Sequence, residues 1–306
     1  MDINKIVIII IISLLIVFTL FLIFNRETFD NYLYKDKILT VVFETDPNNK
    51  NYKKLLKLLD IYGYNYKIIG LNSKWEGFGT KTLQLLEFYK KLDKSQIILQ
   101  LDSRDIIINE HYNELFEKYI YNYYNKIIIS GEYSCCVYPL NNSNNLNDFI
   151  TVEGTRKNNA TNYEYEGPNY SEIWSLKMKN IRDSKGIYSG PYNLNAGMMI
   201  GPADKLISLY ESLNISKNED DQALLTQYFI LNPDTITIDY KQLLFANSEN
   251  TNEGSPFEYT EYNNKWSIVE KDNVGNVKYI VPSIIQTPGK KYEVYDILYQ
   301  YKTQQK

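Results

Sequence analysis

The sequence predicts an α/β fold with a doubly wound, mostly parallel sheet. Apolar runs typical of buried strands alternate with segments of helical periodicity from residue 38 to residue 101, which is the pattern of successive β-α-β units. The third apolar run, residues 96–101, ends abruptly in two carboxylates, Asp102 and Asp105. The carboxyl ends of the strands are the edge of an open α/β sheet where ligands bind.

The expected elements follow one another with short connections. In the first half they are strand 38–43, helix 52–62, strand 66–69, helix 82–92, strand 96–101, helix 112–124 and strand 127–130. Gly63 is expected to end the first helix. The second half is expected to hold helices at 202–212 and 223–229 and short strands at 235–238, 267–270, 279–281 and 283–285. Residues 141–169 are rich in Asn and lose periodicity, which indicates a surface excursion.

The N-terminus carries an apolar run, residues 6–24, which is interrupted only by Ser13 and Thr19. As a helix this run spans roughly 28 Å, close to the hydrocarbon thickness of a bilayer. The predicted organisation is a tail (1–5), a single transmembrane anchor (6–24), a stem (25–37) and one large domain (38–306). More basic residues follow the run than precede it, which slightly favours a cytosolic position for the domain.

Composition excludes several classes of function. The chain of 306 residues has a net charge of −4, so charge gives no support for a nucleic-acid partner. A single histidine, His111, excludes multi-histidine zinc or iron sites. The two cysteines are adjacent, at positions 135 and 136, and supply neither a disulfide framework nor a CxxC metal site.

Asp102 and Asp105 are the first candidates for chemistry. Charge at the end of a buried strand is costly unless it is paired or binds a cation. Two carboxylates and a diphosphate can share one divalent ion, which cancels charge on both sides. The alternative is a turn in which Asp102 caps the next segment and Arg104 pairs with Asp105.

Five motifs in register resemble the glycosyltransferase domain of the procollagen lysyl hydroxylases and related procollagen glycosyltransferases, from about residue 38 to about residue 291. They are Trp75 with Gly79-Thr80-Lys81, Asp102-Ser103-Arg104-Asp105, Ser130-Gly131-Glu132 with Cys136 and Pro139, Asn195-Ala196-Gly197, and Asp220-Asp221-Gln222. The resemblance implies a GT-A fold, a UDP-sugar donor such as UDP-glucose or UDP-galactose, and Mn²⁺, with Mg²⁺ as a second option. It also implies a lumenal domain and a protein or glycan acceptor, such as hydroxylysine of a collagen-like protein.

The resemblance assigns the metal and the leaving group to two segments. Asp102 and Asp105 would hold Mn²⁺. Gln286 stands where the family has a third ligand, a histidine, and its amide oxygen is a weaker ligand for a hard cation. Gly289 and Lys290 follow at about the expected spacing, and Lys290 would stabilise charge on the departing UDP. The iron chemistry of lysyl hydroxylases is not implied, because one histidine cannot supply its ligands.

The nucleotide and its base are assigned to the first part of the domain. Lys81 would lie near the nucleotide, with glycines that let the backbone approach the ligand. Trp75 would stack on the uracil or line its pocket, or else it is a core aromatic. The family has a hydroxyl residue near the uridine where Phe43 stands here, and Thr45 is the candidate substitute.

The sugar and the acceptor are assigned to the second part. Asn195 and Gly197 would form a loop under the donor sugar, and Asp220 and Asp221 would face the sugar and the acceptor, with Gln222 completing the motif. Asp221 would take the acceptor proton in an inverting reaction and position the acceptor in a retaining one. The alternative for the two aspartates is structural, since Asp at a helix start complements the helix dipole.

Two other classes of function remain open. A metal-dependent phosphohydrolase would also place carboxylates after a strand. The missing histidine favours a third possibility, a membrane-anchored carbohydrate-binding or structural protein that has lost catalysis.

Overall fold

The computed structural model describes residues 37–133, 156–159, 162–165, 170–248, 257–260, 264–271, 275–288 and 292–304. The predicted anchor and stem, together with Gly289 and Lys290, lie outside these ranges. Among the described helices, none is both long and apolar enough to cross a bilayer. The transmembrane segment at 6–24 stays a prediction.

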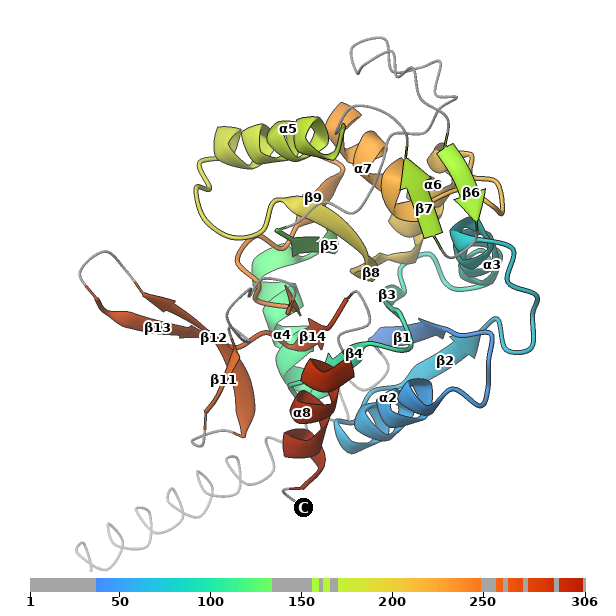
Figure 1. Ribbon diagram of the computed structural model, residues 1–306. Helices are drawn as coiled ribbons and strands as arrows, with labels where there is room; N and C mark the ends of the chain where they lie inside the picture. Colours follow the sequence, from blue (N-terminus) through green and yellow to red (C-terminus); the bar gives the residue numbers. More distant parts are fainter. Residues whose placement is uncertain are drawn as a thin grey trace, which may run out of the picture.

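The main sheet confirms the α/β class and corrects the strand pattern (Figure 1). Its six strands lie in the order β2 (Tyr66–Ile69), β1 (Ile38–Phe43), β3 (Ile97–Leu101), β8 (Asn193–Pro202), β5 (Ile127–Glu132) and β9 (Ile236–Ile238). β8 runs antiparallel to both of its neighbours, whereas the other neighbouring pairs are parallel. The sheet is therefore mixed, and β8 separates β3 from β5.

Helices bury both faces of this sheet. They are α2 (Lys50–Ile61), α3 (Phe78–Tyr89), α4 (Tyr112–Tyr123), α5 (Tyr170–Ser184), α6 (Ala203–Leu213), α7 (Asp221–Leu231) and α8 (Tyr292–Thr303). One apolar cluster joins α2, α4 and α8 to the sheet, and a second joins α3, α6 and α7 to it. Successive residues of β1 belong to different clusters, with Val42 in the first and Val41 in the second. This alternation is expected of a central strand buried on both faces.

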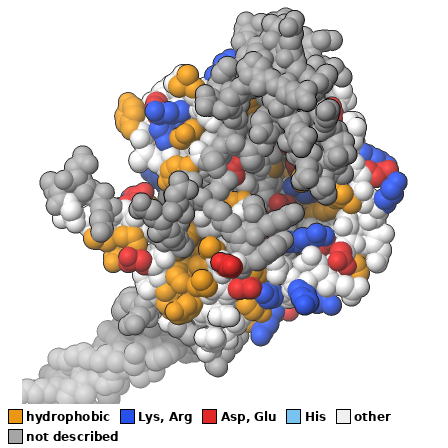
Figure 2. All heavy atoms as spheres, viewed as in Figure 1, with side chains coloured by type: hydrophobic (Ala, Val, Ile, Leu, Met, Phe, Trp, Pro, Cys, Tyr) orange, Lys and Arg blue, Asp and Glu red, His pale blue; other side chains and the backbone are white. Residues whose placement is uncertain are grey.

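Smaller sheets flank the main one. A three-stranded sheet has the order β10 (Phe245–Asn247), β14 (Ile284–Gln286) and β4 (Ile106–Ile108). A second is the antiparallel ribbon β11 (Phe257–Thr260), β12 (Lys265–Lys271) and β13 (Val277–Ile280), and β6 (Arg156–Asn159) pairs with β7 (Asn162–Tyr165). β14 begins and ends one residue later than the sequence predicts, so Gln286 lies inside the strand. On the face in Figure 2, basic and acidic side chains are interspersed, in keeping with the small net charge.

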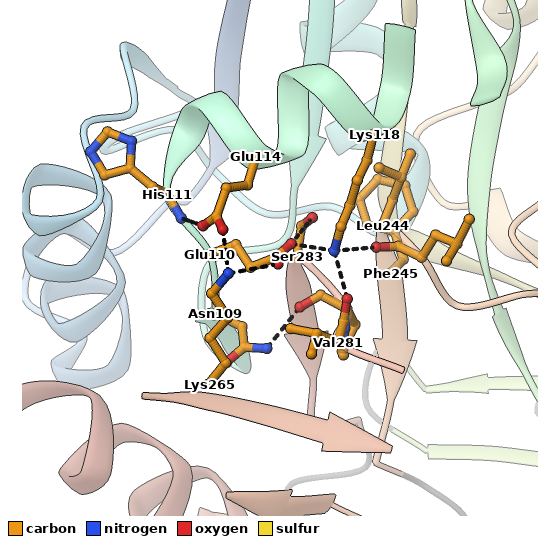
Figure 3. Close-up of polar contacts among 12 residues, drawn as sticks. Asn109, Glu110, His111, Glu114, Lys118, Leu244, Phe245, Lys265, Val281 and Ser283 are labelled. Carbon is orange, nitrogen blue, oxygen red and sulfur yellow. Dashed lines mark hydrogen bonds and ion pairs between the residues drawn. The ribbon is translucent and has the colours of Figure 1, made fainter. Parts of the chain in front are cut away.

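A buried carboxylate, Glu110, fastens the start of α4 to the flanking strands (Figure 3). It accepts from the Ser283 hydroxyl at 2.6 Å and pairs with Lys265 at 3.2 Å and with Lys118. Lys118 also donates to the carbonyl of Val281 at 2.6 Å. Because each buried charge here has a partner of opposite charge, the network is a structural link between α4, β12 and the segment that enters β14.

Lys302, on α8, is a second buried cation close to this network, and only 5% of it is exposed. Its Nζ donates to the backbone carbonyls of Asn109 at 2.6 Å and Asn264 at 2.9 Å. The same atom lies 5.1 Å from the centre of the Tyr62 ring. The C-terminal helix is thus tied to the end of β4 through one ammonium group.

Burial lowers the pKa of Lys302 to about 7, and the charge of Lys265 adds to this shift, while Glu110 and Glu114 oppose it. A free lysine has a pKa of about 10.4, so between the two values the unfolded chain holds more protons than the folded one. The Lys302 contribution to the free energy of unfolding therefore rises with pH across that window. In urea denaturation we expect the native chain to gain stability relative to Lys302→Met above about pH 7, by at most about 1.4 kcal/mol per pH unit. Parallel pH profiles for the two proteins would show that Lys302 stays charged in the fold.

Candidate functional site

Glu44, directly after β1, sets the shape of the loop that carries Asp102 and Asp105. Only 1% of Glu44 is exposed. Arg104 binds its carboxylate through two nitrogens, at 2.9 and 2.6 Å, and the Ser103 hydroxyl donates to it at 2.8 Å. Arg104 therefore pairs with Glu44 rather than with Asp105, which corrects the turn considered from sequence. The bidentate pair fixes Arg104 and Ser103, the residues between the two aspartates.

Asp102 and Asp105 lie where negative charge is unfavourable. Burial raises the pKa of Asp105, and the nearby Asp102 raises it further. The pKa of Asp102 is also raised, again chiefly by burial, although Lys81 opposes the shift. Asp102 thus makes ionisation of Asp105 harder, and Asp221 does the same for Asp102. A bound cation would favour the ionised form of both site aspartates.

Lys81, on α3, is the cation that the fold itself supplies. Its buried Nζ lies 3.1 Å from Asp102 Oδ1 and 2.9 Å from Asp221 Oδ2. Burial acts to lower its pKa, but the two carboxylates outweigh burial and the pKa is raised. Lys81 therefore stays protonated and joins the end of β3 to the first residue of α7.

Gly77 and Gly79 let another segment of the chain, rather than a ligand, approach the start of α3 closely. A Cβ on Gly79 would lie 1.9 Å from the carbonyl oxygen of Ser216, and one on Gly77 would lie 2.7 Å from that of Lys217. Gly77 also has a φ of +141°. The segment before α7 therefore occupies the space that the sequence analysis assigned to a ligand.

Asn195 and Gln222 meet at a third buried acid, Glu132. Asn195 Nδ2 and Gln222 Nε2 donate to its two carboxylate oxygens, at 2.9 and 2.8 Å. Gln222 Oε1 accepts from the backbone N–H of Ala196 at 3.0 Å. Asn195 lies within β8, beside an irregularity in the β5–β8 pairing, rather than in a loop. Three motifs of the sequence thus meet around one carboxylate.

Gln286 and Gly197 lie against each other beside the aspartates. Gln286 is 3% exposed and its Nε2 donates to Asp105 Oδ2 at 3.1 Å. Its Oε1 has no hydrogen-bond partner among the described residues. A Cβ on Gly197, another residue of β8, would lie 2.3 Å from Gln286 Nε2, and the Gly197 carbonyl accepts from the N–H of Asp102 at 2.8 Å. Gly197 therefore gives Gln286 room to reach Asp105.

The remaining candidates occupy less distinctive positions. Trp75 is half-buried, and its ring lies 6.1 Å from that of Phe43 and 5.5 Å, edge-on, from that of Phe78. The N–H of the half-buried Thr45 donates to Glu44 at 2.8 Å.

Asp220 is the N-cap of α7 and accepts from the N–H of Ala223 at 3.0 Å. Asp220 thus takes the helix-starting role given as the alternative, while Asp221 faces Lys81.

Sequence reasoning did not assign roles to Glu44 and Glu132. Both are acids at the carboxyl ends of strands, at β1 and β5, as Asp102 is at β3. The reasoning that selected Asp102 would have selected these two as well. The described residues contain no group of three or more His, Cys, Asp or Glu placed to hold a metal. A third protein ligand to a metal here would have to be another kind of side chain, such as the Gln286 amide that contacts Asp105.

Comparison with known proteins addresses the identity of this site. Residues 34–163 match the family model of the PLOD GT domain. This segment of the chain is therefore similar to the PLOD GT domain. The match confirms the resemblance to the lysyl hydroxylase glycosyltransferase domain. It includes Lys81, both site aspartates and Glu132, and ends before Asn195 and Gln286. We found no curated protein that matches the sequence.

Two solved structures show low similarity. One is a glycosyltransferase involved in the glycosylation of the major capsid of PBCV-1, with 11% identity, coverage of 85% of this chain and 98% of that chain, and a TM-score of 0.42. The other is 4-diphosphocytidyl-2C-methyl-D-erythritol synthase from Anaerococcus prevotii, with 15% identity, coverage of 67% and 88%, and a TM-score of 0.32. At these scores neither similarity identifies the fold or the function.

Glu44 and Arg104 provide a test of the loop architecture. Glu44→Ala would leave Arg104, Ser103 and the N–H groups of Thr45 and Asp46 without their acceptor, so we expect a loss of about 3 kcal/mol or more. The Arg104 side chain is 49% exposed, so Arg104→Ala should cost about 1 kcal/mol or less. Urea denaturation of the two variants measures the difference. Equal losses would mean that the ion pair alone, and not the hydrogen bonds around Glu44, holds the loop.

Proposed function

We propose that the chain transfers a hexose from a UDP-sugar, UDP-glucose or UDP-galactose, to a hydroxyl acceptor with the help of a divalent metal ion. The observation that carries this proposal is the group formed by Asp102, Asp105 and Gln286. Two carboxylates with raised pKa values adjoin a buried amide oxygen that no described residue satisfies. Within a PLOD GT domain, such a group is well suited to a cation that binds a diphosphate.

The donor set fits Mn²⁺ or Mg²⁺. All three groups offer oxygen, which hard divalent cations prefer. The free Gln286 Oε1 would gain a partner on metal binding, and the repulsion between Asp102 and Asp105 would be relieved. A bound ion would neutralise charge on the diphosphate and on the departing UDP.

Other residues would prepare the site for sugar transfer. Lys81 holds the Asp221 carboxylate at 2.9 Å, which orients Asp221 to receive a proton from, or to position, the acceptor hydroxyl. Glu132 fixes Asn195 and Gln222 beneath the sugar. Lys290 would offset charge on the leaving group. A collagen-like protein with hydroxylysine or glycosylated hydroxylysine is the acceptor that the family favours.

The test is turnover of UDP-sugars with and without Mn²⁺, by the native chain and by Asp102→Asn and Asp105→Asn. We expect each substitution to lower turnover at least about 100-fold and to abolish the thermal shift caused by Mn²⁺ with UDP, because a neutral amide is a poor substitute for a charged ligand. Asp234→Asn is the matched control, because its side chain is 95% exposed and lies in a surface pair with Lys185.

Other outcomes would overturn the proposal in different ways. Release of UMP or phosphate without sugar transfer to any acceptor or to water would indicate a phosphohydrolase. Sugar binding without turnover would indicate a binding protein. Metal-dependent UDP binding that survives in the double Asn variant would place the cation elsewhere.

Gln286→His tests the third ligand separately. Imidazole binds Mn²⁺ and softer ions better than an amide does, whereas amide oxygen suits harder ions such as Mg²⁺. We expect the variant to reach half-maximal activity at several-fold lower Mn²⁺, with less gain for Mg²⁺. A metal titration of UDP-sugar turnover measures this, with Gln300→His, at an exposed position on α8, as the control. An unchanged Mn²⁺ dependence in a folded Gln286→His protein would place Gln286 outside the coordination sphere.

A further inference from the structure

We propose that Asn247 forms a subsite that binds a hydroxyl group of the transferred hexose. The inference rests on the proposed function and extends it to residues on β10 that no motif singled out. Asn247 is the last residue of β10, and Ser248 follows it.

The first observation is a pair of unsatisfied amide oxygens. Asn247 and Gln286 are each 3% exposed, and the oxygen of each amide lacks a partner among the residues that the structure describes. A buried polar atom left unpaired costs about 1–3 kcal/mol, so native proteins rarely leave one without a partner. Two neighbouring examples indicate that a ligand completes this region.

The orientation of both amides is fixed by their nitrogen atoms. Asn247 Nδ2 donates to the carbonyl of Gly131 at 2.7 Å, and Gln286 Nε2 donates to Asp105 Oδ2 at 3.1 Å. Rotating either amide by half a turn would bring its oxygen against an acceptor. The two oxygens are therefore the atoms left for a ligand.

The second observation is the pairing of the two strands. Asn247 and Gln286 are register partners in the parallel ladder between β10 and β14, so their side chains emerge on the same face of the small sheet, with the strands about 4.8 Å apart. The Ser248 hydroxyl is also buried and lacks a partner within the described ranges, while its N–H donates to the Gln286 carbonyl at 2.9 Å. As the residue after Asn247 in an extended segment, Ser248 directs its side chain to the opposite face, so the shared face holds the two amide oxygens.

The position of Asn247 connects the two halves of the site. Through Gly131 it lies next to Glu132, the carboxylate that holds Asn195 and Gln222. Through Gln286 it adjoins Asp105. A group bound by Asn247 would therefore lie between the proposed metal ligands and the residues around Glu132, where the sugar of a UDP-sugar has to be placed.

The chemistry of the free atoms selects the ligand. Both amide oxygens accept hydrogen bonds, so the ligand has to bring a donor or a positive charge. Phosphate oxygens are acceptors and do not satisfy them. A cation held by Asp102 and Asp105 would take the Gln286 oxygen, as proposed above, which leaves the Asn247 oxygen for a hydrogen-bond donor. A sugar hydroxyl donates a hydrogen bond and therefore fits the Asn247 oxygen.

The test compares the binding of UDP-hexose with that of UDP, in the presence of Mn²⁺, by calorimetry. In Asn247→Leu, which keeps the size of the side chain and removes the acceptor, we expect affinity for UDP-hexose to fall about tenfold, the effect of one lost hydrogen bond of about 1.4 kcal/mol. Affinity for UDP and the Mn²⁺ dependence should stay within about twofold of the native values, because neither ligand would contact Asn247. Both Asn247→Leu and Asn247→Ala also remove the Nδ2 donor to the Gly131 carbonyl. Asn247→Ala, which adds no branched apolar side chain, serves as the second variant should Asn247→Leu fold poorly.

Deoxy analogues of the donor identify the hydroxyl. The analogue that lacks the bound hydroxyl should bind the native chain about tenfold more weakly and should bind Asn247→Leu no more weakly than the full donor does. Equal losses of UDP and UDP-hexose binding, or a lower melting temperature with unchanged binding of both, would make Asn247 a structural residue and overturn the inference. Failure of the native chain to bind UDP would instead overturn the proposed function, and this subsite with it.

Discussion

The arrangement of the site depends on one buried ammonium group. Lys81 lies between Asp102 and Asp221 and is in contact with both. Without this cation, the carboxylates at the end of β3 and the start of α7 would be close and uncompensated, which a partly buried site does not tolerate. Because Lys81 stands one turn into α3, it also fixes how that helix meets the main sheet. The same ion pair therefore determines packing and preorganises the carboxylates.

Acidic residues recur at the carboxyl ends of the strands of the main sheet. Glu44, Asp102, Glu132 and Asp239 stand at or directly after β1, β3, β5 and β9. Glu44 accepts hydrogen bonds from Arg104 and from two backbone N–H groups. Glu132 accepts from two side-chain amides. Asp239 accepts from the N–H groups of Leu244 and Phe245. Glu44 and Asp239 thus hold loops in place, and Glu132 joins β8 to α7, whereas Asp102 pairs with Lys81.

Features of the fold and the site that depend on neighbouring residues could be predicted from the sequence. Features that depend on a partner far along the chain could not. Periodicity predicted the first three strands and their helices, and strand-end charge selected Asp102 and Asp105 as candidates. Arg104 was paired with its neighbour because its partner, Glu44, is 60 residues away. The insertion of β8 between β3 and β5 was equally inaccessible, since its antiparallel direction follows from long-range pairing and not from its own composition. Glu132 and Asn247 are the last residues of β5 and β10, and their partners in the fold are visible only from the contacts.

The packing at the start of α3 has a consequence for how a diphosphate is held. Many nucleotide-binding α/β proteins place phosphate at the positive end of a helix dipole, where free N–H groups point at the anion. In α3 the N–H of Gly79 donates to the carbonyl of Glu219 at 2.9 Å, and that of Thr80 donates to the carbonyl of Lys217 at 3.1 Å. The glycines bring a strip of backbone carbonyls onto this helix end and close it to anions. In the proposed reaction, charge on the nucleotide would have to be balanced by side chains and by an ion, a task that this helix end could not perform.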